Sequence, residues 1–126
     1  MLDKSALVLF SGGQDSTVSL LWACENFKYV ETVGFNYDQR HLIEMKCREK
    51  ILIKIKKIFS VCKNKLGEDH IIDIPALGLL SETALTRDSE IFVQQNGLPS
   101  TFVPGRNLIF FNMASALGWR RNIFNL

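Results

Sequence analysis

The chain has few cysteines, little net charge and no long apolar run, and each shortage excludes a class of protein. Its three cysteines, Cys24, Cys47 and Cys62, are odd in number and none forms a Cys-x-x-Cys pair. That argues against a disulfide framework or a zinc site within this chain. No uninterrupted apolar stretch reaches membrane-spanning length, and the first residues lack the basic region and apolar core of a signal peptide. These shortages predict a cytoplasmic protein with no membrane partner.

The small net charge also argues against a nucleic-acid partner. A charge of +2 does not by itself indicate nucleic-acid binding, although eight of the fifteen Lys and Arg residues lie between Lys46 and Lys65. No aromatic platform is interleaved with these lysines, so a solvated helix face is favoured over an RNA surface. The 126 residues, 47% of them apolar, leave room for one domain with a real core.

The most informative segment present is a glycine pair flanked by hydroxyl residues. It stands between a predicted buried strand over 6–10 and a predicted helix over 18–24. Two glycines let the chain turn tightly and bring N–H groups close to a phosphate, and the helix directs its positive end at the same point. Ser11, Ser16 and Thr17 add hydroxyl donors. The sequence therefore predicts an anion-binding loop, with an ordinary capped Gly-Gly turn as the alternative.

Two common phosphate loops are absent from the chain. No Gly-Lys dipeptide occurs, which excludes the Walker A loop, and the Rossmann pattern Gly-x-Gly-x-x-Gly does not occur either. The pattern Ser-Gly-Gly-x-Asp-Ser directly after a strand instead resembles the PP-loop of the ATP-pyrophosphatase superfamily. Members of that superfamily split ATP between the α- and β-phosphates and hold the pyrophosphate in this loop. The resemblance implies ATP and Mg²⁺ as ligands of Phe10, Ser11, Gly12, Gly13, Gln14, Asp15, Ser16 and Thr17.

Predicted strands and helices alternate along the rest of the chain. The apolar patterns predict a strand over 29–36, a helix over 42–66 with Gly67 as its C-cap, a strand over 70–74 stopped by Pro75, a short helix over 76–86, irregular or lid-like chain over 90–101, a helix over 108–119 and the start of a strand over 122–126. Such alternation predicts an α/β fold, in which helices cover both faces of a parallel sheet. No internal repeat or linker divides it.

The long predicted helix has two faces of opposite character. Its lysines at positions 46, 50, 54 and 57 line one side. The opposite, apolar side combines Ile51, Leu52, Ile55, Ile58, Phe59, Cys62 and Leu66. We therefore expect the apolar side to pack against the sheet and the lysines to face solvent.

Two polar segments are candidates for the rest of a site. Tyr37, Gln39, Arg40 and His41 directly follow the second predicted strand, and ligands of an open α/β sheet bind at the carboxyl ends of its strands. A polar turn before a capped helix is the alternative, and the local pattern does not decide between them. Further on, Pro104-Gly105-Arg106-Asn107 predicts a turn that starts a helix capped by Asn107. Arg106 would lie near the positive N-terminus of that helix, where its charge favours binding an anionic ligand. A surface ion pair with a nearby acidic residue is the alternative.

Taken together, the PP-loop, the Tyr-x-Gln-Arg-His segment and the Thr-Phe-Val-Pro-Gly-Arg-Asn segment resemble the 7-cyano-7-deazaguanine synthase family of queuosine biosynthesis. The resemblance covers essentially the whole chain and implies a Rossmann-like fold of the adenine nucleotide alpha-hydrolase type. It implies an ATP-dependent ligase that joins 7-carboxy-7-deazaguanine and ammonia. Asp15 and Arg106 would be catalytic, and Tyr37, Gln39, Arg40 and His41 would bind the substrate. The oligomeric state stays open, with a homodimer among the options.

The chain departs from that family in two places. Asp38 stands where the family has glycine, although Asp tolerates unusual backbone angles better than most residues. The family also continues into a part whose cysteines bind a structural zinc, and those ligands are not in this chain. We therefore expect a single PP-loop ATP-binding domain over 1–126, truncated before the zinc-binding part. Other PP-loop enzymes, namely an NAD synthetase, a lysidine synthetase or a tRNA thiolase, and a non-catalytic nucleotide-binding remnant are the alternatives.

Overall fold

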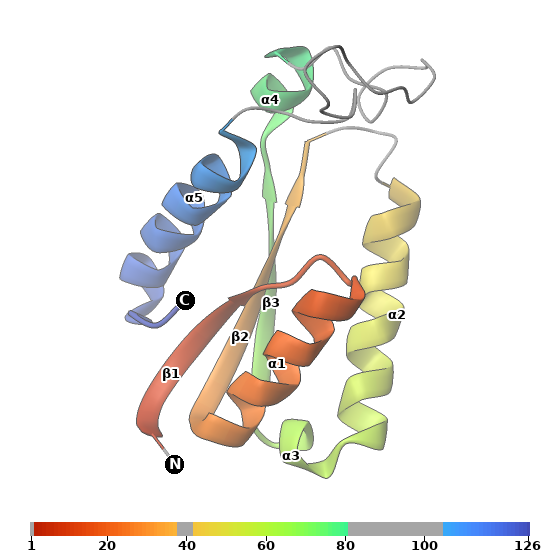
Figure 1. Ribbon diagram of the computed structural model, residues 1–126, viewed down its shortest axis with the longest axis vertical. Coiled ribbons are helices and arrows are strands. Elements are labelled where there is room, and N and C mark those ends of the chain that lie inside the picture. Colours follow the sequence, from red (N-terminus) through yellow and green to blue (C-terminus); the bar gives the residue numbers. More distant parts are fainter. Residues whose placement is uncertain (1, 38–41, 81–104) are drawn as a thin grey trace.

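A parallel sheet lies at the centre of the molecule (Figure 1). The computed structural model describes residues 2–37, 42–80 and 105–126. The sheet has the strand order β1-β2-β3, and both strand pairs are parallel. Its strands are β1 (Leu2–Leu9), β2 (Phe27–Asn36) and β3 (Leu66–Asp73).

Helices cover both faces of this sheet, as Figure 1 shows. One face carries three of them, and the other carries the last helix of the chain. The helices are α1 (Gln14–Asn26), α2 (Leu42–Ile58) and α3 (Ser60–Lys63) on the first face, α4 (Pro75–Leu80) after β3, and α5 (Arg106–Arg121) on the second face. The predicted α/β fold, a parallel sheet between helices, is confirmed. None of the helices in the described ranges is both long and apolar enough to cross a bilayer.

Alternation along β1 divides the core between the two faces. Ala6, Val8 and Phe10 pack with α1, α2 and α3, and the neighbouring Leu7 and Leu9 pack toward α5. The first cluster also contains the buried Leu20, Ala23, Cys24, Val30, Leu52, Ile55, Cys62 and Leu66. Both faces of β1 are therefore buried, as expected in a parallel sheet that helices cover on both sides.

The end of the chain returns to the free edge of β1. Asn125 forms an isolated parallel bridge with Ala6, and the Leu7 N–H donates to the Asn125 carbonyl at 2.8 Å. The strand predicted to start over 122–126 is thus a single bridge. Since β2 lies on one edge of β1 and Asn125 on the other, and since α1 and α5 lie on opposite faces, the carboxyl end of β1 is a topological switch point. Open α/β sheets bind ligands at such points.

The single helix predicted over 42–66 is wrong. α2 ends at Ile58, Phe59 has extended backbone angles (φ −101°, ψ 108°), and α3 covers Ser60–Lys63. Leu66 begins β3, because the Val30 N–H binds the Lys65 carbonyl at 2.9 Å and draws the chain into the sheet. Sheet pairing has overridden the helical period of the sequence.

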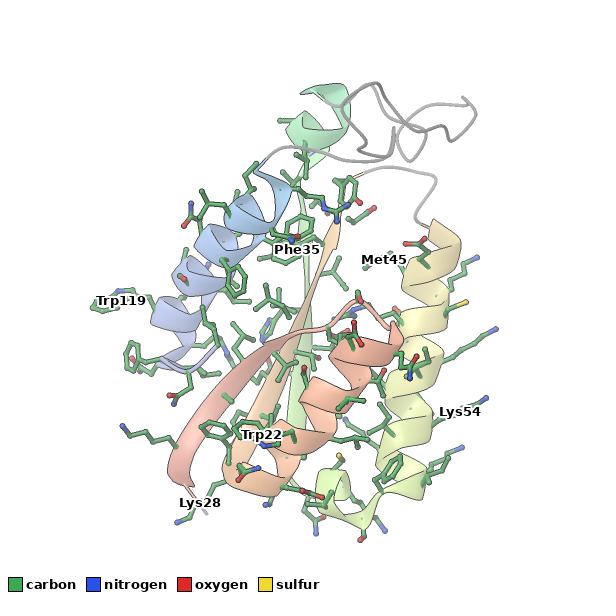
Figure 2. The ribbon with its side chains drawn as sticks, viewed as in Figure 1. Trp22, Lys28, Phe35, Met45, Lys54 and Trp119 are labelled. Atoms are coloured by element: carbon green, nitrogen blue, oxygen red, sulfur yellow. The ribbon has the colours of Figure 1, made fainter. Side chains whose placement is uncertain are left out.

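Of the two predicted faces of that segment, the apolar face is only partly buried, whereas the lysine face is exposed. Leu52 and Ile55 are buried, but Ile58 is 70% and Phe59 40% exposed, because the chain turns before they reach the sheet. The lysines at positions 46, 50, 54 and 57 are exposed as predicted. Figure 2 shows Lys54 pointing away from the sheet.

Gly67 is not a helix cap, because it lies within β3. A Cβ atom there would come within 2.2 Å of the Tyr29 hydroxyl, so the missing side chain makes room for that ring. The true left-handed helix end is Asn122 (φ 58°), after α5, where the Ile123 N–H donates to the Gly118 carbonyl at 2.8 Å. The helix predicted over 76–86 is present as α4 up to Leu80, and the rest of it, with the segment predicted over 90–101, lies outside the described residues.

Candidate nucleotide-binding site

A cavity of about 690 Å³ lies at the carboxyl ends of β1 and β2, between α2 and α5. Ser11 and Asp15 line it from the loop after β1, and Arg106 lines it from α5. In Figure 2, Met45 on α2 and Phe35 on β2 mark its two sides. The other lining residues are Leu9, Phe10, Val33, Gly34, Tyr37, Glu44, Arg48, Asn107, Phe110 and Phe111.

The predicted anion-binding loop is held in shape by its own hydroxyls. Ser16 Oγ accepts from the Ser11 N–H and donates to the Gly13 carbonyl, both at 3.2 Å, and Thr17 Oγ1 donates to the same carbonyl at 2.8 Å. Gly12 has φ +91°, a conformation that residues with a side chain rarely adopt. In this structure the Ser16 and Thr17 hydroxyls therefore fix the turn.

Within the described ranges, no side chain caps the N-terminus of α1. Its N-cap is Gly13, which makes no side-chain cap hydrogen bond. Asp15, which could by its residue type cap a helix or bind a metal ion, does not cap this one, because it lies in the first turn, exposed and lining the cavity. An uncapped helix start offers its N–H groups and its positive end to an anion, and the Asp15 carboxylate beside it offers oxygen ligands to a cation. Gln14 is exposed at the first position of α1.

Arg106 begins α5 and lines the same cavity. The residue before it, Gly105, has φ +73° and serves as the N-cap without a side-chain hydrogen bond, so the prediction that Asn107 caps the helix is wrong. The Arg106 guanidinium carbon lies 5.8 Å from the centre of the Phe110 ring, which orients the side chain. The fold thus brings Asp15 and Arg106, distant in sequence, to one cavity.

The cavity also has an aromatic wall, of which sequence analysis had named only Tyr37. The rings of Phe35 and Phe110 stack at a centroid distance of 4.3 Å, and the centre of the Tyr37 ring lies 5.9 Å from that of Phe110. Phe35 and Tyr37 alternate with Asn36 at the end of β2, and this period of two was the available signal. Tyr37, a predicted substrate-binding residue, is buried and lines the cavity, whereas Gln39, Arg40 and His41 lie outside the described residues.

Behind the loop, Arg48 is a second group that sequence analysis missed. Its side chain is 1% exposed and donates from Nε to the Phe10 carbonyl at 2.7 Å. It also forms an ion pair with Asp69 of β3. The signal was its position, since Arg48, Leu52 and Ile55 follow the i, i+4, i+7 spacing of a buried helix face.

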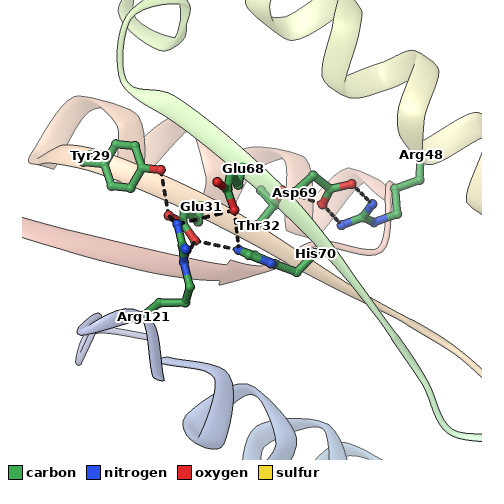
Figure 3. Close-up of polar contacts among 8 residues, drawn as sticks. All are labelled: Tyr29, Glu31, Thr32, Arg48, Glu68, Asp69, His70 and Arg121. Atoms are coloured by element: carbon green, nitrogen blue, oxygen red, sulfur yellow. Dashed lines mark hydrogen bonds and ion pairs between the residues drawn. The ribbon is translucent and has the colours of Figure 1, made fainter. Parts of the chain in front are cut away.

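A separate polar cluster lies on the α5 face of the sheet (Figure 3). The buried Glu31 carboxylate accepts from the Tyr29 hydroxyl at 2.6 Å and from Arg121 Nη2 at 2.8 Å, and His70 Nε2 lies 2.6 Å from it. Burial by itself would raise the pKa of Glu31. The hydrogen bonds from Arg121, Tyr29 and His70 outweigh burial and lower that pKa from 4.5 to about 2.

This cluster joins α5 to the sheet. Ligand atoms of Glu31, Glu68 and His70 lie within 4.8 Å of one another, a spacing that could suit a metal ion. However, Arg121 Nη2 approaches Glu31 at 2.8 Å and Glu68 at 3.4 Å, so a side-chain cation already balances both carboxylates. The arrangement is an ion-pair network at the last turn of α5.

The cysteines lie away from the cavity lining described here. Cys24 and Cys62 are fully buried. Core-like spacing on predicted helices suggested burial of all three cysteines, which is wrong for Cys47, because it is exposed. Burial, together with the hydrogen bond between Cys24 and Cys62, raises the pKa of Cys24 to about 12, which keeps its thiol protonated and unreactive.

A family model described as "Queuosine biosynthesis protein QueC" matches residues 5–126. The chain belongs to the QueC family. It is 58% identical over 119 residues to a 7-cyano-7-deazaguanine synthase of Gluconobacter oxydans, with 94% of this chain and 49% of the relative covered. It is 53% identical over 121 residues to the synthase of Paracidovorax citrulli, covering 96% of the chain and 52% of the relative.

The synthase of Rhodopseudomonas palustris is similar at 55% identity over 124 residues, covering 98% of the chain and 52% of the relative. These matches confirm the resemblance drawn from the three sequence segments. The chain spans about half the length of the QueC-family relatives it matches.

Proposed function

We propose that the chain is the ATP-binding part of a ligase that converts 7-carboxy-7-deazaguanine and ammonia to 7-cyano-7-deazaguanine in queuosine biosynthesis. One observation carries the proposal. A Ser-Gly-Gly-x-Asp-Ser loop in a QueC-family chain lies at the topological switch point and shares a cavity with Arg106.

The chemistry explains why such a ligase needs a pyrophosphate loop. A carboxylate is a poor electrophile because its leaving group would be oxide. Attack of the carboxylate on the α-phosphorus of ATP releases pyrophosphate and turns that oxygen into part of AMP. Ammonia then displaces AMP to give an amide, and a second activation removes the amide oxygen as AMP to leave the nitrile. The protein must hold pyrophosphate, align the reacting groups and exclude water.

The loop residues fit the triphosphate. The uncapped α1 N-terminus and the turn at Gly12 and Gly13 would accept the pyrophosphate, and the hydroxyls of Ser11, Ser16 and Thr17 can exchange a bond within the loop for one to a phosphate oxygen. Asp15 would hold Mg²⁺, which neutralises phosphate charge when bound. Arg106 would bind a phosphate or the substrate carboxylate from the other side of the cavity.

The aromatic wall suits a planar base. Stacked Phe35 and Phe110 with the tilted Tyr37 ring give the cavity an apolar surface on which adenine or deazaguanine could lie. Tyr37 also carries a hydroxyl that can orient a ring substituent. We assign Gln39, Arg40 and His41, which follow Tyr37 in sequence, to the same substrate-binding group.

Asp15→Ala should weaken Mg²⁺-dependent ATP binding by roughly tenfold or more, because the substitution removes the charged carboxylate that we propose holds the metal ion. Isothermal titration of ATP with and without Mg²⁺ measures the change. Glu25→Ala is the matched control, because it removes an exposed carboxylate from the other end of α1. Equal ATP affinity in the Asp15 variant and the parent would remove Asp15 from the site.

Arg106→Lys should abolish most nitrile formation while folding stays intact, because lysine keeps the charge and loses the planar fork. We would make the matching substitution in a full-length relative and assay 7-cyano-7-deazaguanine formed from the acid, ATP and ammonia. Arg120→Lys, the same change at an exposed position near the end of α5, is the control. A parent with no nitrile formation would refute the proposed reaction, and an Arg106 variant within a few-fold of the parent would refute its role.

A further inference from the structure

We infer that Arg48 is the positioning residue of the phosphate loop: it fixes the point at which β1 turns into the loop and does not itself bind phosphate. The inference concerns how the proposed site is built. The identity of the ligand that the loop binds rests on the proposed function, but the role of Arg48 in holding the loop in position does not.

Arg48 connects three elements of the fold at the base of the loop. From α2, its Nε donates to the carbonyl of Phe10, the residue immediately before Ser11, at 2.7 Å. Its terminal nitrogens both contact the Asp69 carboxylate on β3. Asp69 in turn accepts from Thr32 Oγ1 on β2 at 2.7 Å, as Figure 3 shows in part. The end of β1 is therefore tied to α2 and, through one carboxylate, to both other strands.

The surrounding glycines fit the Arg48 side chain closely. A Cβ atom at Gly34 would lie 2.5 Å from Arg48 Nε and 2.8 Å from Cζ, so only glycine leaves room for the guanidinium beneath β2. A Cβ at Gly12, inside the loop, would lie 3.3 Å from Arg48 Cα. The guanidinium also lies 5.5 Å from the Phe10 ring centre. The loop and the sheet thus fit one fixed rotamer of Arg48.

The same contacts argue against Arg48 as a phosphate ligand, although it lines the cavity. Both terminal nitrogens of its planar fork contact Asp69 end-on, which balances its charge, and Nε is committed to Phe10. The side chain is 1% exposed. Arg48 therefore supplies position, and the charge for phosphate must come from the α1 N-terminus, the metal ion and Arg106.

These two roles predict opposite effects of Asp69→Asn. A phosphate ligand would gain free charge when Asp69 loses its carboxylate, and ATP would bind more tightly. A positioning residue would lose its own anchor, so the loop would loosen and ATP would bind more weakly. Arg48→Lys and Gly34→Ala test the same contact in other ways, since the first removes the fork and the second displaces it while Arg48 remains.

The experiment measures amide hydrogen exchange of the free 126-residue chain, comparing the segment 10–17 with β3 and α5, and then titrates ATP with Mg²⁺. In all three variants we expect roughly tenfold faster exchange in the loop, with the other segments within about twofold of the parent. We expect ATP affinity to fall by roughly tenfold as well. Arg120→Lys should match the parent in both measurements. Using three variants keeps the test informative if one of them does not fold.

Three results would overturn the inference: tighter ATP binding in Asp69→Asn, unchanged loop exchange with lost ATP affinity in Arg48→Lys, or exchange raised equally in every segment. The last would mean that Arg48 only stabilises the fold. A parent chain that binds no ATP would count against the proposed function, while faster loop exchange in the variants would still support the positioning role.

Discussion

Acidification from about pH 5 to pH 2 should strongly destabilise the chain, and Glu31→Gln should remove the largest single part of that loss. The Glu31 pKa lies near 2 in the folded protein, against an ordinary 4.5. A carboxyl group whose pKa is lowered by folding stabilises the folded state. This stabilisation is complete at pH values above the pKa of the unfolded chain and is lost as the pH falls through the pKa of the folded protein. For Glu31 this amounts to on the order of 3 kcal/mol.

Urea unfolding at several pH values between 2 and 7 measures this dependence. Gln keeps the volume of Glu31 and can still bond with Tyr29 and Arg121, but it does not titrate. Glu68→Gln is the control, because Glu68 is 63% exposed and its contact with Arg121 is longer, so screening leaves it little effect. If Glu31→Gln retained the acid slope of the parent, the buried ion-pair network would not be its source.

Gly12→Ala should lower ATP affinity by roughly a hundredfold, since two costs act at one position. The residue has φ +91°, which an L side chain rarely adopts, and the new methyl group would meet Arg48 Cα at 3.3 Å. The loop must shift, and its N–H groups would then no longer converge on the pyrophosphate that we propose it binds. Isothermal titration with ATP and Mg²⁺ measures the loss.

Gly105→Ala separates the two costs. Gly105 shares the left-handed conformation, with φ +73°, but a Cβ atom there meets nothing within 4 Å. It should therefore show the backbone strain without the clash and lose less ATP affinity. Equal losses in the two variants would show that close packing against Arg48 is irrelevant, and an unchanged Gly12→Ala would remove the turn from the site.

The sequence by itself determined the parts of this protein that depend on neighbouring residues. The apolar run over 6–10, the glycine pair and the helix after it predicted the loop between β1 and α1, because turn chemistry and helix starts are local. The alternation of strands and helices predicted the fold class, and three short segments predicted the family. Arg106 and Tyr37 were chosen from such segments, and both line the cavity.

Only the tertiary structure decided which distant residues meet. Local periodicity continued a helix through Phe59 to Leu66, but pairing with Val30 made Leu66 the start of β3. The Arg48–Asp69 and Glu31–Arg121 pairs join residues 21 and 90 positions apart. Their partners depend on sheet register and on which face each helix covers, and a charged residue carries no local sign of either. The partners of the buried charges, and the stacking of Phe110 on Phe35, therefore became visible only when the strands and α5 were in place.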